Sequence, residues 1–174
     1  MQCYKYRFKT NIKINGESDS ILTRKLYTFD SSKTNQTYWV YVDECVHNIC
    51  VIKFHLKNHR NSKYKYNLLT NLGEARSVVY TCLNLLINEF HYKNRYTSFG
   101  FIASNKKDED YRNTKRLRFY KRFITTFIGS ETFAHYEYID KSAYILIPHI
   151  AVDNNPNLPI EYFKMLQEHN FIEY

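Results

Sequence analysis

A long helical pattern lies in the middle of the chain, between segments that alternate as strands do. Its apolar residues recur three and four positions apart over residues 74–90, which places them on one face of a helix. These residues are Val78, Val79, Cys82, Leu83, Leu85, Leu86 and Phe90. A helix with one apolar face must cover another element, so the neighbouring strands predict a helix packed against a sheet.

Strand patterns occur on both sides of this helix. Residues 4–9 alternate strictly between aromatic and basic side chains, as a half-buried strand does. Residues 11–36 are polar and predict turns around a short element near 21–27. The other predicted strands are 38–42 and 49–56 as a hairpin, 64–69, 99–103, and 135–138 with 143–147 as a closing hairpin. Two more helices are predicted, at 110–128 and 159–166.

This order of elements predicts a single α+β domain over residues 1–174. Its central sheet is expected to be mixed and mostly antiparallel, with helices flanking it, and residues 148–174 are expected to form a C-terminal tail with a short helix. A length of 174 residues leaves little room for a second domain. Aromatic residues make up 17% of the chain, which is too many for a disordered protein.

The charge of the chain suggests an anionic ligand or partner. The formal net charge is +8 at pH 7, and the pI is about 9.2. No apolar segment approaches the roughly 20 residues that span a membrane, and the N-terminus lacks the apolar core of a signal peptide. We therefore expect a cytoplasmic protein without a membrane partner.

The cysteines predict free thiols rather than a metal site. They stand at positions 3, 45, 50 and 82, and no pair has the close spacing of zinc ligands. The seven His residues are scattered and supply no ligand pair either. No metal is expected.

The junction before the long helix is a candidate phosphate-binding loop. Gly73 and the small residue Ala75 lie at the helix start, where exposed backbone N–H groups and the helix dipole favour a negative charge. Arg76 can add a charge-assisted contact. A tight chain reversal explains the same glycine equally well, so both interpretations stay open.

The segment 112–122 is the second candidate site. Six of its eleven residues are basic, and Phe119 and Tyr120 are interleaved with them. Such a helix face can bind phosphate, on a nucleotide or on a nucleic-acid backbone. The alternative is a solvated basic face balanced by the acidic residues 108–110 at its N-terminal end.

Together, the order of elements and these two segments resemble the GNAT superfamily of acyl-CoA-dependent N-acetyltransferases. In that family a splayed strand leads to a loop of pattern Gln/Arg-x-x-Gly-x-Gly/Ala, and residues 70–75 read Thr-Asn-Leu-Gly-Glu-Ala. A later helix of the family carries Asn-x-x-Ala-x-x-Leu/Phe-Tyr, and residues 113–120 read Asn-Thr-Lys-Arg-Leu-Arg-Phe-Tyr. The resemblance covers residues 38–147. The chain is also similar to small bacterial proteins of unknown function that share the Asn-Thr-Lys-Arg helix and a later Ser-Ala-Tyr strand.

The resemblance implies acetyl-CoA as the cofactor and an unidentified amine as the acceptor. Tyr120 then has the role of the acid that protonates the departing thiolate. The resemblance places cofactor contacts at Leu69, Asn71, Gly73, Glu74, Ala75, Arg76, Asn113 and Arg116. The chain departs from the family pattern at Thr70, at Arg116 in place of a small residue, and in the lack of a carboxylate on 64–69.

The residues also suggest candidates for a general base and an alternative function. Glu44 and His55 are available as a general base, although each is also explained as a surface charge or a satisfied polar residue. The alternative function is that of a non-catalytic binding protein with the same fold. In that case the basic segment 112–122 would dock nucleic acid or an acidic protein partner.

Overall fold

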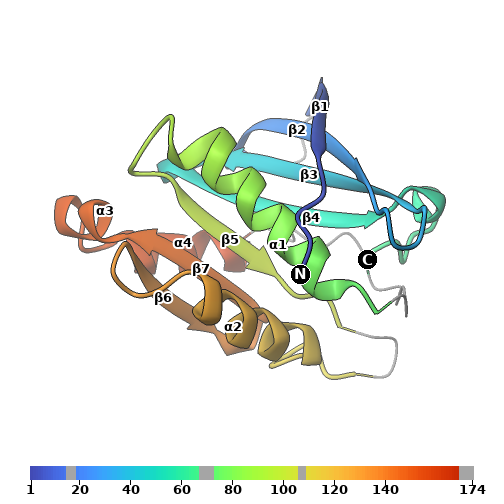
Figure 1. The fold of residues 1–174 in the computed structure, drawn as a ribbon. Helices are drawn as coiled ribbons and strands as arrows, with labels where there is room; N and C mark the ends of the chain where they lie inside the picture. Colours follow the sequence, from blue (N-terminus) through green and yellow to red (C-terminus); the bar gives the residue numbers. More distant parts are fainter. Residues whose placement is uncertain (15–18, 67–72, 106–108, 169–174) are drawn as a thin grey trace.

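A seven-stranded sheet with helices on both faces forms the body of the protein (Figure 1). The computed structural model describes residues 1–14, 19–66, 73–105 and 109–168. The strand order across the sheet is β1-β2-β3-β4-β5-β7-β6. The predicted single-domain α+β class, with a mixed and mostly antiparallel sheet, is confirmed.

Most of the predicted elements are present in the described residues. The strands are β1 (Tyr6–Ile12), β2 (Ile21–Asp30), β3 (Thr37–Cys45), β4 (Ile49–Leu56), β5 (Ser98–Ile102), β6 (Phe133–Tyr138) and β7 (Ala143–Pro148). The helices are α1 (Ala75–Leu86), which continues into the π-helical turn η3 (Ile87–His91), α2 (Lys115–Phe127), α3 (His149–Asn154) and α4 (Leu158–Glu168). Short 3-10 turns follow β3, β4 and β6 as η1 (Val46–Asn48), η2 (Lys57–His59) and η4 (Ile139–Lys141).

The sheet is antiparallel except at one place in its centre. There β4 and β5 run parallel and pair over four residues, from Ile49 with Ser98 to Ile52 with Phe101. Strand β4 then continues to Leu56, whereas β5 ends at Ile102. Residues 53–56 of β4 therefore have no partner on β5, and we call this segment the open end of β4.

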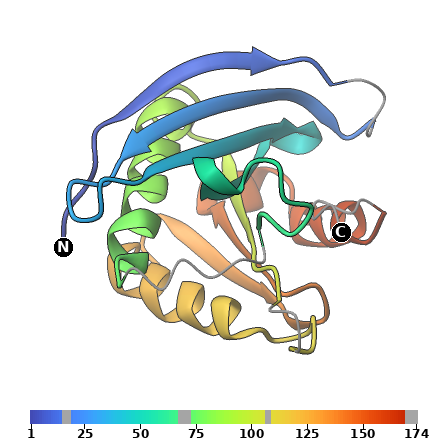
Figure 2. The same ribbon diagram turned by 90° about the vertical axis from the view of Figure 1, so that its right-hand side faces the viewer.

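The two faces of the sheet carry separate apolar cores. Helices α1 and α2 cover one face, which we call the α1/α2 face, and α3 and α4 cover part of the other, the α4 face (Figure 2). On the α1/α2 face Phe29 and Tyr38 are stacked at a ring separation of 5.1 Å and are almost fully buried. On the α4 face the largest buried side chain is Tyr162. The alternation of side chains along each strand assigns the strand residues of the site below to one of these two faces.

Three sequence predictions are corrected by the structure. The strand predicted at 64–69 is wrong for residues 64–66, which form a turn, and 67–69 lie outside the described residues. Within 11–36, the short element is instead the ten-residue strand β2. The helix predicted from 110 begins at Lys115, because Asn113 has a left-handed backbone (φ 49°) that a helix cannot contain. Helix α3 was not predicted.

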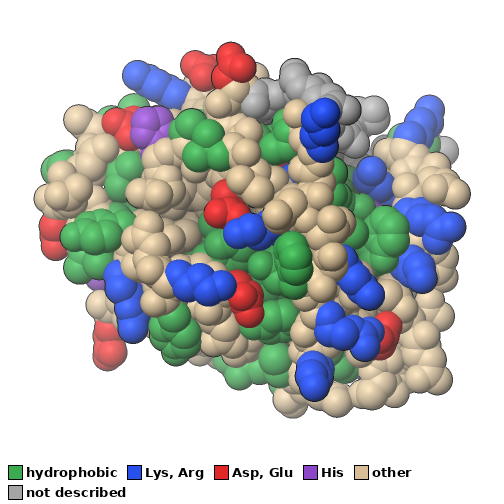
Figure 3. All heavy atoms as spheres, turned by 90° about the horizontal axis from the view of Figure 1, so that it is seen from above, with side chains coloured by type: hydrophobic (Ala, Val, Ile, Leu, Met, Phe, Trp, Pro, Cys, Tyr) green, Lys and Arg blue, Asp and Glu red, His purple; other side chains and the backbone are tan. Residues whose placement is uncertain are grey.

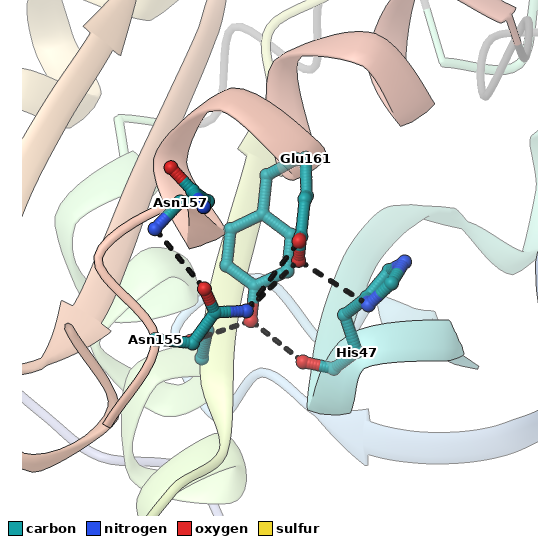
Figure 4. Close-up of polar contacts among 6 residues, drawn as sticks. His47, Asn155, Asn157 and Glu161 are labelled. Atoms are coloured by element: carbon teal, nitrogen blue, oxygen red, sulfur yellow. Dashed lines mark hydrogen bonds and ion pairs between the residues drawn. The ribbon is translucent and has the colours of Figure 1, made fainter.

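Helix α4 is tied to the turn between β3 and β4 by polar contacts (Figure 4). The Tyr162 hydroxyl donates to the His47 carbonyl at 2.7 Å and lies 3.0 Å from the Ser98 hydroxyl. Beside it, Glu161 is 3.4 Å from His47 Nδ1 and accepts from the Asn155 amide at 3.2 Å. The C-terminal helix therefore closes the α4 face through one buried hydroxyl and a partly exposed carboxylate.

Replacing Tyr162 by Phe tests how much this hydroxyl stabilises the fold. The variant keeps the ring but leaves the His47 carbonyl and the Ser98 hydroxyl without their partner, so we expect a loss of about 2 kcal/mol in the free energy of unfolding. Urea unfolding measures it. Tyr92→Phe is the control, since that ring is 61% exposed, and should change stability by no more than about 0.5 kcal/mol. Equal stability of the two variants would contradict this role.

Candidate functional site

His55 lies on the open end of β4, on the α4 face of the sheet. It is 4% exposed. Three aromatic rings surround its imidazole, with centroid separations of 6.1 Å to Trp39, 5.6 Å to Tyr41 and 5.3 Å to Tyr66. All three rings are only half-buried, so the imidazole lies beneath a partly exposed aromatic layer.

The hydrogen bonds of His55 define which nitrogen carries the proton. Nδ1 is 2.7 Å from the Leu56 carbonyl, which can only accept, so Nδ1 carries the hydrogen. Nε2 then holds the lone pair, and it is buried without a hydrogen-bond partner among the described residues. Burial lowers the pKa of His55 below its ordinary value, and the nearby Lys65 and His59 add to this against the opposing bond to Leu56. Burial therefore disfavours the protonated imidazolium, and Nε2 keeps its lone pair.

A buried ion cluster adjoins His55 on the same face. Asp43 is fully buried and is bound by Arg24 at 2.6 and 3.1 Å and by Lys53 at 3.0 Å. Side-chain exposure is only 12% for Arg24 and 9% for Lys53. Arg24 and Lys53 therefore both contact one carboxylate in a poorly solvated place.

The segment after β4 crosses its open end and is fastened there. The Ser104 hydroxyl, just after β5, donates to the Tyr66 carbonyl at 2.6 Å. Arg116 donates to both that carbonyl and the Ser104 hydroxyl. The predicted cofactor residue Arg116 therefore points toward the open end of β4 instead of lying on a solvated basic face.

Glu74, predicted near a cofactor, has its carboxylate surrounded by hydroxyl groups. Its side chain does not cap α1, although the residue occupies the N-cap position. Oε1 accepts from Tyr38 at 2.8 Å and from Thr34 at 3.0 Å, while Oε2 accepts from Tyr4 at 3.0 Å and from Ser31. This carboxylate joins the N-terminal segment, the β2–β3 turn and β3 to the start of α1.

The pKa of Glu74 reflects this environment. Burial by itself raises the pKa of the carboxyl, but the hydrogen bonds from the four hydroxyls outweigh it and lower the pKa below its ordinary value. The residue is therefore ionised at neutral pH. Its negative charge is stabilised by the four hydroxyl dipoles and by the nearby positive end of the α1 helix dipole.

The other predicted loop residues lie at the start of α1. Gly73 has φ 64°, a left-handed conformation that favours glycine, and its carbonyl accepts from Lys33 at 3.3 Å. Ala75 and Arg76 are exposed in the first turn of the helix. Leu69 and Asn71 lie outside the described residues. The structure thus brings Gly73, Lys33 and Arg76 to one helix end.

The start of α2 is organised by two hydroxyls that the sequence analysis did not single out. Thr114 is the N-cap and accepts from the Leu117 N–H at 3.2 Å. Its own N–H donates to the Ser142 hydroxyl at 3.0 Å, and the two hydroxyls are 2.8 Å apart. Asn113 is exposed beside them. The sequence does carry a signal for Thr114, because a Thr directly before the first residue of a helical pattern is a favoured N-cap.

Tyr120 is buried on the α1/α2 face. Its ring lies 6.1 Å from that of Phe101 on β5, and the residue is 8% exposed. Burial raises the pKa of Tyr120 to about 12, against the opposing charge of Arg116. The phenol therefore carries its proton at neutral pH.

The basic segment 112–122 is largely engaged within the protein. Arg112 pairs with Asp110 at 3.1 Å and Lys121 pairs with Glu137, while Arg118 donates to the Asn113 carbonyl. With Arg116 turned inward, four of its six basic side chains have internal partners. Across the face over β1 and β2, Lys and Arg are likewise interspersed with hydrophobic and acidic side chains (Figure 3). Docking of nucleic acid or an acidic protein stays a prediction.

Comparison of the chain with protein-family models, with curated proteins and with solved structures finds no match. The resemblance to the acyl-CoA N-acetyltransferases therefore stays a prediction. In the described part of the chain, no helix has the length and apolarity needed to cross a membrane. No group of three or more His, Cys, Asp or Glu side chains is placed to hold a metal ion within these residues.

Replacing Glu74 by Gln tests the hydroxyl cluster. The amide cannot accept from all four hydroxyls, so we expect a loss of about 2 kcal/mol in the free energy of unfolding at pH 7. The pKa of Glu74 is lower in the folded than in the unfolded protein, so its contribution is present above the unfolded value and is lost as pH falls through the folded value. The stability difference between wild type and variant should therefore shrink in acid.

Urea unfolding at a series of pH values measures this effect. Glu131→Gln is the control, because that carboxylate is exposed, and it should change stability by no more than about 0.5 kcal/mol. A stability difference for Glu74→Gln that does not change with pH would contradict the role of the ionised carboxylate.

Proposed function

We propose that the protein is an acyl-CoA-dependent N-acetyltransferase of the GNAT type. The observation that carries the proposal is the open end of β4, where the one parallel pair of the described sheet separates beside His55 Nε2, which has no hydrogen-bond partner among the described residues. A strand that leaves its neighbour exposes backbone N–H and C=O groups in the middle of a sheet. Such groups can bind an extended ligand and polarise its carbonyl.

The acceptor amine and acetyl-CoA would approach each other from opposite faces of the sheet. His55 belongs to the α4 face, whereas Tyr120 and the N-terminus of α1 belong to the α1/α2 face. Beyond their four paired residues, β4 and β5 separate between these two faces. In this arrangement the acceptor amine comes from the α4 face and acetyl-CoA from the α1/α2 face.

The residues at the start of α1 fit the phosphates of such a cofactor. Gly73 keeps the backbone approachable, since even an added Cβ would meet only Lys33 Nζ at 3.6 Å. Lys33 and Arg76 supply positive charge beside the first N–H groups of the helix. Acetyl-CoA, when bound, supplies an acetyl group activated as a thioester.

The proton steps are assigned to His55 and Tyr120. The neutral amine forms a bond to the acetyl carbonyl carbon as the carbon–sulfur bond breaks. Nε2 of His55 accepts the amine proton, and Tyr120 gives its proton to the departing thiolate. Solvent then returns a proton to Tyr120 and removes one from His55. Arg116, fastened to Tyr66 and Ser104, holds the segment that crosses the opening.

Calorimetric titration with acetyl-CoA tests the proposed cofactor. We expect binding in the micromolar range for the wild type and at least tenfold weaker binding for Arg76→Glu, which places a negative charge at the helix start. Arg95→Glu makes the same change beyond the opposite end of α1 and should bind as the wild type does. No binding by the wild type would contradict the proposal, and salt-dependent binding of nucleic acid would then favour the basic segment as the functional surface.

Replacing Tyr120 by Phe separates catalysis from binding. We expect acetyl transfer to fall by a factor of about 10² or more while the affinity for acetyl-CoA is kept. Tyr80→Phe, on α1, is the matched control and should retain full activity. Release of coenzyme A thiol, measured against a panel of amines, gives the rate. Unchanged turnover for Tyr120→Phe would exclude this residue as the acid.

A further inference from the structure

The segment that follows β4, residues 57–66, concentrates positive charge at the protein surface. Residues 45–73 contain five Lys or Arg and no acidic residue, and four of the five lie in this segment. Arg60 and Lys63 are exposed, and neither forms an ion pair with an acidic side chain in the described part of the chain. By contrast, four of the six basic side chains of 112–122 have internal partners. Arg60 and Lys63 therefore present positive charge to solvent, where it attracts an anionic partner.

Tyrosine rings alternate with the cations of this segment. Tyr64 is 52% exposed, and the Lys63 ammonium lies 4.9 Å from the centroid of its ring. The ammonium groups of Lys65 and of Lys53, on β4, lie 5.2 and 6.0 Å from the ring centroid of Tyr66. A cation beside an exposed ring offers two different contacts, because the cation can pair with a phosphate while the ring stacks on a base.

The aromatic surface continues from this segment onto the α4 face of the sheet. Tyr66 is half-buried, as are Trp39 and Tyr41, and all three rings surround the imidazole of His55. None of the three rings belongs to the apolar cluster beneath α3 and α4, so they lie on the part of the sheet that these helices leave open. What we call the aromatic–basic surface consists of Trp39, Tyr41, Arg60, Lys63, Tyr64 and Tyr66.

We propose that the aromatic–basic surface binds single-stranded nucleic acid. Phosphates pair with Arg60 and Lys63, and unpaired bases stack on Tyr64 and on the partly exposed rings of the sheet. A single strand fits better than a duplex, because only unstacked bases offer their faces to aromatic side chains. It also fits better than an acidic protein, whose carboxylates would pair with the cations but leave the exposed ring without a stacking partner. This inference does not rest on the proposed acetyl transfer.

Fluorescence anisotropy with three labelled probes tests this inference on the wild-type protein. The probes are oligothymidylate of about 15 nucleotides, a DNA duplex of the same length, and polyglutamate. We expect micromolar binding of oligothymidylate at about 50 mM salt, at least tenfold tighter than binding of the other two. No binding of oligothymidylate, or a duplex that binds as tightly, overturns the inference. Polyglutamate that binds as tightly also overturns it, and assigns the surface to an acidic protein. Acetyl-CoA binding decides the proposed function independently.

A pair of charge-removing substitutions locates the phosphates. Arg60→Gln combined with Lys63→Gln should weaken oligothymidylate binding at least tenfold. It should also reduce the slope of log affinity against log salt by about 1.4, because each phosphate contact contributes about 0.7 on a single strand. Lys115→Gln combined with Arg122→Gln is the matched control, since both residues are exposed on α2, and it should keep the affinity and the slope. An equal or larger effect of the control pair places the strand on 112–122 and overturns the assignment.

A tyrosine substitution tests the stacking contact. Tyr64→Ala should weaken oligothymidylate binding at least fivefold and leave the salt slope unchanged, because it removes a ring and no charge. Tyr92→Ala is the matched control. Its ring is 61% exposed and also lies beside a cation, with the Arg95 guanidinium 5.1 Å from the ring centroid. Equal affinities of Tyr64→Ala and the wild type overturn the stacking role. The comparison of the three probes on the wild type does not depend on how any variant folds.

Discussion

Two antiparallel halves of the sheet are joined by one parallel pairing of four residues. The pairing requires close approach, since a Cβ on Gly100 would lie 3.3 Å from Val51. The shortness of this junction leaves the open end of β4 without a partner on β5. Lys53 and His55 both lie on this end of the strand, on the α4 face.

The protein stabilises this arrangement with polar contacts instead of a continuous ladder. The Glu74 carboxylate, at the start of α1, accepts hydrogen bonds from four hydroxyls, and these hydroxyls come from three separate segments. Arg116 and Ser104 fasten the segment that crosses the opening. Thr114 and Ser142 fix the start of α2 in the same way. Each of these contacts lies at the start of a helix, α1 or α2.

Periodicity made α1 and β3 predictable, because burial on one face leaves a regular trace in their sequences, whereas β4 and β7 were predictable as apolar runs buried on both faces. The strand predicted at 64–66 failed because Tyr-Lys alternation also suits a turn, in which Lys63 and Lys65 lie over neighbouring tyrosine rings at 4.9 and 5.2 Å. The candidate site was harder to foresee. The free nitrogen of His55 depends on its tautomer and on its neighbours across the sheet, and neither is encoded by local spacing.

The cluster around Glu74 also bears on the order in which the chain folds. Its Tyr4 donor is 70 residues away in the sequence, and its nearest donor, Tyr38, is 36 away. Contacts of such range form late, after the loops between them have closed. A carboxylate buried before its hydroxyls arrive is strongly unfavourable, so Glu74 stays hydrated until β2 and β3 are in place. Docking of the N-terminal segment is then among the last steps of folding, and its detachment among the first steps of unfolding.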